Sequence, residues 1–212
     1  MPARAMLRPM TIALRKPMSL QDFLSWEREQ ELRFEFDGQR PVAMTGGTAA
    51  HALLQGNLAA ALIPRLRGQP CRFLGSDIKV QVAGSIRYPD GLVTCAPLPP
   101  RSTVVREPVV VFEVLSPRTA STDRITKNHE YASTPSIRRY VMLEQDRVGA
   151  TVFSRQGTGQ GTGEGTGEGA DWVGHILLDD AVLDLPEIGI SLPLRELYEG
   201  IEVAGEDSAE EI

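Results

Sequence analysis

Cysteine and histidine, the residues from which many metal and redox sites are built, are scarce in this sequence. Its 212 residues hold two cysteines and three histidines. Cys71 and Cys95 have neither CxxC spacing nor nearby histidines, so neither a zinc site nor a disulfide framework is expected. We interpret both as reduced, buried thiols of a cytoplasmic protein.

Long apolar runs are also lacking. No stretch approaches the roughly 20 residues that span a bilayer, so the sequence predicts no membrane-embedded role. Arg8, Pro9 and Arg15 interrupt the basic start of the chain before the apolar core of a signal peptide develops. We therefore expect residues 1–18 to form a disordered leader.

Positive charge is in deficit, with 22 Lys and Arg against 28 Asp and Glu and a net charge of −6. This balance argues against a nucleic-acid-binding protein, because phosphate contacts need Lys and Arg. However, residues 202–212 hold five acidic and no basic residues. They predict an acidic disordered tail, and they leave residues 19–201 as one domain.

The spacing of apolar residues predicts an α/β (α+β) fold. Helical spacing or capping patterns predict helices at residues 19–30, 48–67, 121–133 and 192–201. Pro64 should kink or end the second of these. Apolar runs, alternating or continuous, predict strands at residues 73–82, 87–94, 109–115 and 138–144.

Two hairpins complete this prediction. The N-terminal one joins residues 32–36 to 41–44 through Asp37-Gly38, a pair suited to a tight turn. The C-terminal one pairs residues 149–154 with 172–178. Its tip, residues 157–169, is rich in Gly and Thr and predicts a flexible loop.

Glu113 is the strongest anomaly of the sequence. It interrupts Val109–Leu115, a run that is otherwise apolar on both faces and so predicts a central strand covered by helices. A buried carboxylate is costly unless it is paired, protonated or bound to a metal. The alternative to a functional role is an ion pair with an arginine such as Arg139 on a neighbouring strand.

Asp90 is a candidate partner for Glu113. Pro89-Asp90-Gly91 alone is an ordinary turn sequence, but pairing of the next strand with that of Glu113 would bring the two carboxylates together. With a backbone carbonyl, expected from Val114, and water, they form an oxygen-rich site for Mg²⁺ or Mn²⁺. Such an ion activates water and neutralises phosphate, which predicts a phosphodiesterase site.

Positively charged residues follow Glu113 in the sequence. Asp123, Lys127 and Tyr131 share one face of the third predicted helix, so Lys127 could point at the end of the Glu113 strand. An ordinary Asp123–Lys127 helix pair is the alternative. Residues 118–139 hold five basic and two acidic residues, which favours a polyanionic substrate.

Two further candidates have equally plain alternatives. Glu35 lies between Phe34 and Phe36 and faces away from them, so it is either exposed or near the site. His51 lies toward the core on the second predicted helix, where a lone histidine is more often structural. It could instead contact a scissile phosphate or orient a carboxylate.

The ordered set of these motifs resembles the Uma-two family of restriction endonucleases, in the PD-(D/E)XK nuclease superfamily. The resemblance covers roughly residues 19–197. It rests on Phe34-Glu35-Phe36-Asp37-Gly38, His51, Pro89-Asp90, Phe112-Glu113-Val114-Leu115-Ser116-Pro117 and the face of Asp123, Lys127 and Tyr131.

The resemblance implies a restriction-endonuclease-like mixed β-sheet flanked by helices and a homodimer. It also implies that Asp90 and Glu113 are metal ligands, with Glu35 near the same site. In the wider superfamily a lysine stands two positions after the strand acid, where this chain has Leu115. Lys127 is the replacement that the family pattern suggests.

The resulting hypothesis is Mg²⁺- or Mn²⁺-dependent hydrolysis of DNA phosphodiester bonds. Asp90 and Glu113 would hold the metal with the Val114 carbonyl, Lys127 would position water or stabilise charge, and Glu35 would assist, with His51 as a further candidate. One rival is a non-catalytic nuclease-like module that binds nucleic acid or a protein partner. Another keeps the metal site and gives it a different phosphate-containing substrate.

Overall fold

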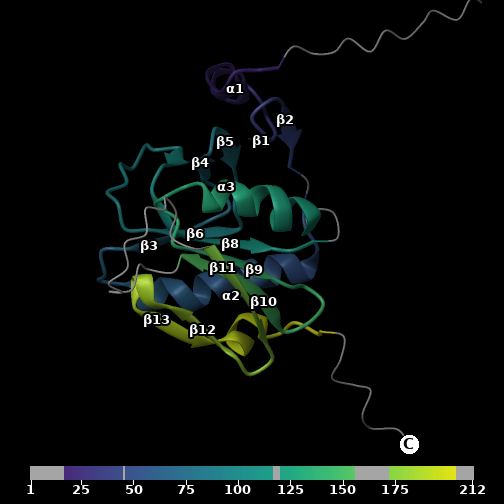
Figure 1. Ribbon diagram of the computed structural model, residues 1–212, viewed down its shortest axis with the longest axis vertical. Helices are drawn as coiled ribbons and strands as arrows, with labels where there is room; N and C mark the ends of the chain where they lie inside the picture. The colour runs from purple at the N-terminus through teal and green to yellow at the C-terminus, as the bar shows by residue number, and fades with distance from the viewer. Residues whose placement is uncertain (1–16, 45, 117–119, 156–171, 204–212) are drawn as a thin grey trace, which may run out of the picture.

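The computed structural model describes residues 17–44, 46–116, 120–155 and 172–203. A small sheet with a short helix lies at one end of the molecule, and a large sheet between helices forms the body (Figure 1). The expected flexible loop, nearly all of the expected leader and most of the expected acidic tail lie outside the described residues. No helix within the described ranges is long and apolar enough to cross a membrane.

The large sheet has the strand order β11-β10-β9-β8-β6-β3. Its strands are β3 (Arg72–Gly75), β6 (Gly91–Thr94), β8 (Pro108–Val114), β9 (Arg139–Leu143), β10 (Gly149–Arg155) and β11 (Trp172–Leu178). Only β8 and β9 pair in parallel, so the sheet is mixed, as predicted. β8 lies in its interior because both of its faces are apolar, and this confirms the predicted central strand.

The small sheet has the order β2-β1-β5-β4-β7. Its strands are β1 (Phe34–Phe36), β2 (Pro41–Ala43), β4 (Lys79–Val82), β5 (Ser85–Arg87) and β7 (Val104–Val105). β1 and β2 form the predicted N-terminal hairpin, and Gly38 in its turn has a φ of +89°, which glycine adopts without a steric penalty. Helix α1 (Leu20–Glu27) begins at Ser19, whose side chain caps it as predicted.

Helices cover both faces of the large sheet (Figure 1). On one face, α2 (Ala49–Leu66) packs Leu54 and Leu58 against Phe112 and Val114 of β8. On the other, Tyr131 packs in a cluster with Val111. Since successive strand residues point to opposite faces, Glu113 shares the face of Val111 and Tyr131.

The predicted third helix is present in two parts. A π-helical stretch, Thr122–Lys127, leads into α3 (Asn128–Ala132). A π-helix inserts extra backbone into a turn and is frequent at functional sites. Pro64 lies inside α2 near its C-terminal end, which comes two residues later at Leu66.

Three predicted elements were wrong in extent or type. The expected strand 73–82 is two strands, β3 and β4, in different sheets, and the expected strand 87–94 is likewise divided between β5 and β6. The expected helix 192–201 is a short strand followed by a 3₁₀ helix. This region holds β12 (Val182–Leu185), the 3₁₀ helix Pro186–Ile188, β13 (Ile190–Pro193) and the 3₁₀ helix Leu194–Tyr198.

The reduced-thiol interpretation was also wrong, because Cys71 and Cys95 form a disulfide. Cys71 precedes β3 and Cys95 follows β6, and these strands pair antiparallel with Arg72 opposite Thr94. The cysteines are therefore cross-strand neighbours. The sequence did not predict this pairing, because the cysteines are 24 residues apart and spacing along the chain does not show the register of paired strands.

Candidate active site

Glu113 is almost fully buried beside the π-helical stretch and α3. Its Oε1 accepts hydrogen bonds from Lys127 Nζ at 2.9 Å and from the Tyr131 hydroxyl at 3.0 Å. Arg139 instead pairs with Glu187 at 2.7 Å, so the expected alternative pair with Glu113 was wrong. Burial raises the pKa of Glu113 well above its ordinary value, and the Lys127 ammonium opposes this rise.

Lys127 lies among three carboxylates. Its Nζ is 2.9 Å from Glu113, 3.1 Å from Asp123 and 3.4 Å from Glu35. The alternative helix pair with Asp123 is thus present, but both side chains are buried. One ammonium holds together acids from β8, the π-helical stretch and β1, and these acids raise the pKa of Lys127.

Asp90 lies between β5 and β6 and is tied to β8. Its Oδ2 accepts the backbone N–H of Val114 at 2.6 Å, and its Oδ1 accepts from the Gln55 side chain at 2.5 Å. The Asp90 side chain is only 12% exposed, so this segment is not an ordinary turn at the surface. The Asp90 carboxylate lies beside Val114, the residue after Glu113, and its negative charge contributes to the raised pKa of Glu113.

Close packing of α2 on β6 explains how α2 reaches Asp90. A side chain in place of Gly91 would put its Cβ 2.7 Å from the Phe73 ring and 3.1 Å from Leu58 of α2. Glycine therefore allows the helix to approach the strand. The first turns of α2 then project His51 and Gln55, four residues apart, toward Asp90.

His51 contacts Asp90, and this contact raises the pKa of the imidazole. Its Nε2 is 3.3 Å from Asp90 Oδ2, and its side chain is 18% exposed. The hydrogen bond to Asp90 raises the pKa of His51, while partial burial opposes that rise. The Asp90 carboxylate thus stabilises the protonated imidazole relative to that of an unperturbed histidine.

Glu35 is not exposed, contrary to one of the two readings of the sequence. It lies on β1, and its Oε2 accepts from Arg87 at 3.1 Å while its Oε1 accepts the Tyr88 N–H at 3.1 Å. Arg87 in turn donates twice to Glu130 of α3, at 2.7 Å each. A buried chain of charges thus links the small sheet to the Lys127 cluster.

Several side chains at this site were missed or underrated in the sequence. No sequence pattern pointed to Arg87. Gln55 could have been found only from its spacing of four residues from His51, which places both on one face of a helix. Leu115 occupies the position of the usual lysine and is buried in the core. Its carbonyl accepts a hydrogen bond from Gln145 at 2.6 Å.

Oxygen donors of the right kind for a hard cation meet at this place. Asp90 and Glu113 supply carboxylates, and the hydrogen bonds from Lys127 and Tyr131 are both to Oε1 of Glu113. These features fit Mg²⁺ or Mn²⁺, which prefer oxygen ligands. Within the described ranges no group of three or more His, Cys, Asp or Glu side chains is arranged to hold an ion, so a backbone carbonyl would have to contribute.

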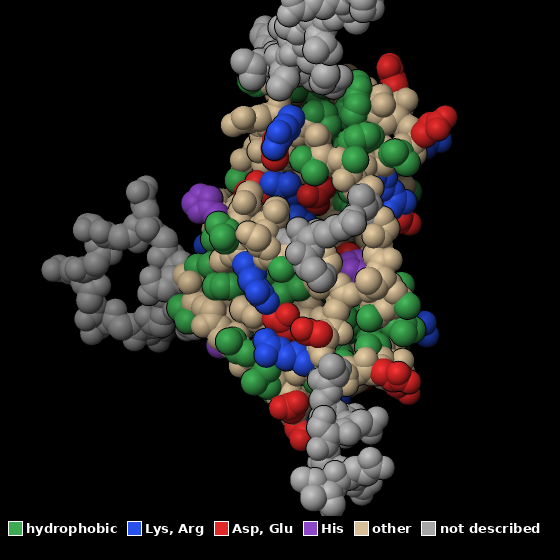
Figure 2. Space-filling view, turned by 90° about the vertical axis from the view of Figure 1, so that its right-hand side faces the viewer, with side chains coloured by type: hydrophobic (Ala, Val, Ile, Leu, Met, Phe, Trp, Pro, Cys, Tyr) green, Lys and Arg blue, Asp and Glu red, His purple; other side chains and the backbone are tan. Residues whose placement is uncertain are grey.

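The basic residues near the site are largely neutralised. Arg124 pairs with Glu144 at 2.9 Å, and Arg139 pairs with Glu187, while Lys127 is buried. The face shown in Figure 2 carries Lys and Arg side chains interspersed with Asp and Glu rather than one broad basic region. Of the basic residues in 118–139 that the structure describes, only Arg138 is exposed without an ion-pair partner, and Arg118 lies outside the described residues.

Comparisons with known proteins agree with this fold. The sequence pattern of the Uma2 family, described as "Putative restriction endonuclease", matches residues 20–185. A crystal structure described as a putative nuclease belonging to DUF820, from Anabaena variabilis, has a TM-score of 0.67 at 16% identity. The match covers 86% of this chain and 98% of that one, and it shows the shared restriction-endonuclease-like fold.

Two uncharacterized proteins of Synechocystis sp. are similar in sequence. One is 31% identical over 188 residues, which cover 87% of this chain and 93% of the relative. The other is 26% identical over 143 residues, covering 64% of this chain and 80% of the relative. With the family pattern matched over most of its length, the chain belongs to the Uma2 family and has its restriction-endonuclease-like fold.

Proposed function

We propose that this protein hydrolyses DNA phosphodiester bonds with the help of Mg²⁺ or Mn²⁺. The observation that carries the proposal is the hydrogen bond of Asp90 to the Val114 backbone, which anchors one acid beside another, Glu113. Glu113 lies one residue before the end of β8, and this hydrogen bond holds the Asp90 carboxylate at the same strand end. Membership of a nuclease family supports the same reaction class.

The ion would be held by Asp90, Glu113 and the Val114 carbonyl. When bound, it supplies a Lewis acid that lowers the pKa of water and neutralises charge on the phosphate. The burial of Glu113 supports this role. Burial raises its pKa, and the neighbouring acids add to that rise, so a divalent cation at this place would favour its ionised form.

Lys127 would place positive charge beside the reacting phosphate or orient water. Its contacts with Glu113, Asp123 and Glu35 hold the ammonium in place. No lysine is then needed at position 115, where this chain has Leu115. Glu35 would assist by holding Lys127 from the side of β1. His51 would keep Asp90 oriented through its contact with Oδ2.

The remaining parts of the proposal concern the whole protein. We propose one nuclease domain over residues 19–201, preceded by a leader and followed by an acidic tail. A homodimer is part of the same proposal, because it follows from the family resemblance, whereas the expected cytoplasmic location rested on reduced thiols and loses that support with the Cys71–Cys95 disulfide. Size-exclusion chromatography with light scattering would test the dimer.

A cleavage assay tests the reaction. Supercoiled plasmid is incubated with the full chain and Mg²⁺ or Mn²⁺, and wild type is compared with Asp90→Asn. We expect nicked or linear product only from wild type. Asp77→Asn is the matched control, because Asp77 carries the same charge on an exposed side chain paired with Arg33. Equal cleavage by wild type and Asp90→Asn would refute the assignment.

A non-catalytic nuclease-like module is the second candidate. It is favoured by the complete pairing of Lys127, since a side chain held by three acids has less freedom to serve a substrate. Calorimetry with Mn²⁺ distinguishes the two. Failure of wild type to bind Mn²⁺, with Glu113→Gln still folded, would favour the module. Parallel assays with RNA and single-stranded DNA test the alternative of another phosphate substrate.

A further inference from the structure

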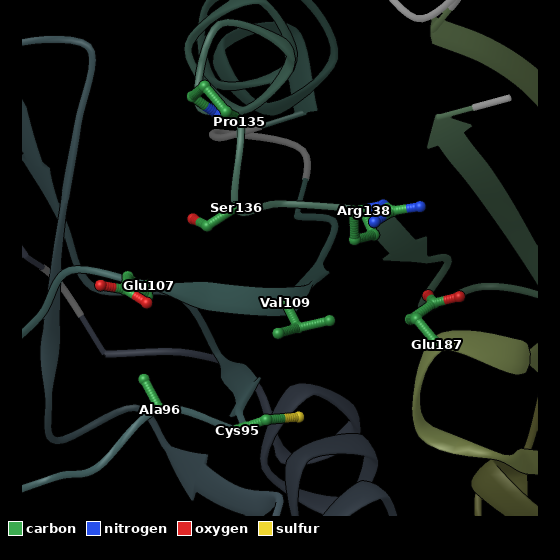
Figure 3. A pocket seen from close by; sticks show the side chains of 8 residues that line it. All are labelled: Cys95, Ala96, Glu107, Val109, Pro135, Ser136, Arg138 and Glu187. Carbon is green, nitrogen blue, oxygen red and sulfur yellow. The ribbon is translucent and has the colours of Figure 1, made fainter. Parts of the chain in front are cut away.

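An open pocket of about 550 Å³ lies at the N-terminal end of β8 (Figure 3). Val109 lines it, four residues before Glu113, which corresponds to roughly 13 Å along a strand. Its other walls come from the segment after β6, the segment between α3 and β9, and the 3₁₀ helix Pro186–Ile188. This pocket is separate from the candidate active site.

Cys95 places the disulfide at the wall of this pocket. Its sulfur points into the space framed by the labelled side chains in Figure 3. Cys95 is half-buried, while Cys71 is only 8% exposed and does not line the pocket. A molecule that enters the pocket therefore reaches the sulfur of Cys95 before that of Cys71.

Charged groups of both signs are available in the pocket. Arg138 and Glu107 are exposed, and neither has an ion-pair partner in the part of the chain that the structure describes. They lie on opposite sides of the space in Figure 3. Glu187 also lines the pocket but is held by Arg139.

Ser136 adds an unsatisfied polar atom. Its Oγ is buried and has no hydrogen-bond partner among the described residues. A buried hydroxyl without a partner is unfavourable, but because this oxygen is not accessible, it does not serve a ligand in the pocket. The pocket thus offers a cation, Arg138, and an anion, Glu107, beside one disulfide.

We propose that the pocket binds small thiols that carry both a carboxylate and an ammonium group, and that these exchange with the disulfide at Cys95. Arg138 would pair with the carboxylate and Glu107 with the ammonium. The bound thiolate attacks the sulfur of Cys95 and forms a new S–S bond. The Cys71–Cys95 bond breaks, and Cys71 leaves as a thiolate that takes up a proton.

This step conserves the number of disulfide bonds, so no other oxidant or reductant is required. The preferred attack on Cys95 follows from accessibility, because exchange depends on which sulfur the thiol can reach. Charge recognition by Arg138 adds selectivity for a zwitterionic thiol over a neutral one. The reaction rests on the pocket alone and does not depend on nuclease activity.

The test uses the oxidised full chain and two probe thiols. Reduced glutathione carries carboxylates and an ammonium, whereas 2-mercaptoethanol is neutral. Rates are compared at equal thiolate concentration, with rapid alkylation, and the mixed disulfide is located by peptide mass spectrometry. We expect glutathione on Cys95. Arg138→Gln should slow the reaction with glutathione about two- to fivefold, the effect of one exposed ion pair, and leave the rate with 2-mercaptoethanol unchanged.

Arg106→Gln is the matched control, because Arg106 is exposed next to Glu107 but does not line the pocket. It should leave both rates unchanged. In Cys71→Ser, oxidised glutathione should form the same adduct on Cys95 and show the same dependence on Arg138. Glutathione on Cys71, equal slowing of both probes by Arg138→Gln, or two free thiols in the oxidised protein would each overturn the proposal.

Discussion

Replacement of Lys127 by methionine should destabilise the protein in a pH-dependent way. Methionine keeps most of the side-chain volume but removes the ammonium that lies within 3.4 Å of Glu113, Asp123 and Glu35. Removal of one partner from a buried ion pair costs about 3–5 kcal/mol. We expect a loss of that size in the free energy of unfolding near pH 8.

The loss should shrink as the pH falls. The pKa of Glu113 in the folded protein already lies above 4.5 because of burial, and Lys127 opposes that rise, so the variant raises it further. A carboxyl with a raised folded pKa contributes stability below its unfolded pKa and loses it as the pH rises through the folded pKa. Near pH 5 the loss should be smaller by at least about 1 kcal/mol, roughly one pKa unit of one carboxyl.

Urea denaturation followed by tryptophan fluorescence measures this effect at both pH values. Arg124→Met is the matched control, because Arg124 lies three residues earlier, is 50% exposed and pairs with Glu144. It should cost no more than about 1 kcal/mol. The double variant Lys127→Met with Glu113→Gln should recover about 1–3 kcal/mol as coupling. A Lys127→Met loss below about 1 kcal/mol at pH 8, or one independent of pH, would refute the reasoning.

Three further predictions follow from the same contacts. Asp90→Asn should lower the pKa of His51 toward 6.5, because the Asp90 hydrogen bond is the main cause of its rise; NMR titration of the imidazole would measure it, and an unchanged pKa would contradict the contact. Glu113→Gln should become more stable relative to wild type as the pH rises above 4.5, because the glutamine lacks the carboxyl whose pKa is raised by folding. Chemical denaturation at several pH values measures this, and a difference in the free energy of unfolding that does not change with pH would contradict it. Arg87→Met should cost about 3–5 kcal/mol, because it leaves the Glu130 carboxylate buried without its arginine; a thermal melt equal to that of wild type would exclude this.

Much of the fold was visible in the sequence. The apolar run around Glu113 predicted the central strand β8, and the Ser19 cap and Asp37-Gly38 pair predicted α1 and the first hairpin. These signals are local: period, caps and turn residues act within a few positions. Two of the predicted strands were wrong where the chain passes from one sheet to the other, because periodicity does not show that β3 and β4 belong to different sheets.

The candidate site likewise has features that the sequence predicted and features that only the tertiary structure shows. The sequence by itself determined that Glu113 needs a positively charged or metal partner, because a carboxylate in an apolar strand is costly wherever that strand lies. Only the tertiary structure decided that the partner is Lys127, that Gln55 and Val114 hold Asp90, and that Cys71 meets Cys95. These contacts join residues far apart in the chain, and their geometry depends on strand register and helix packing, which no local pattern specifies.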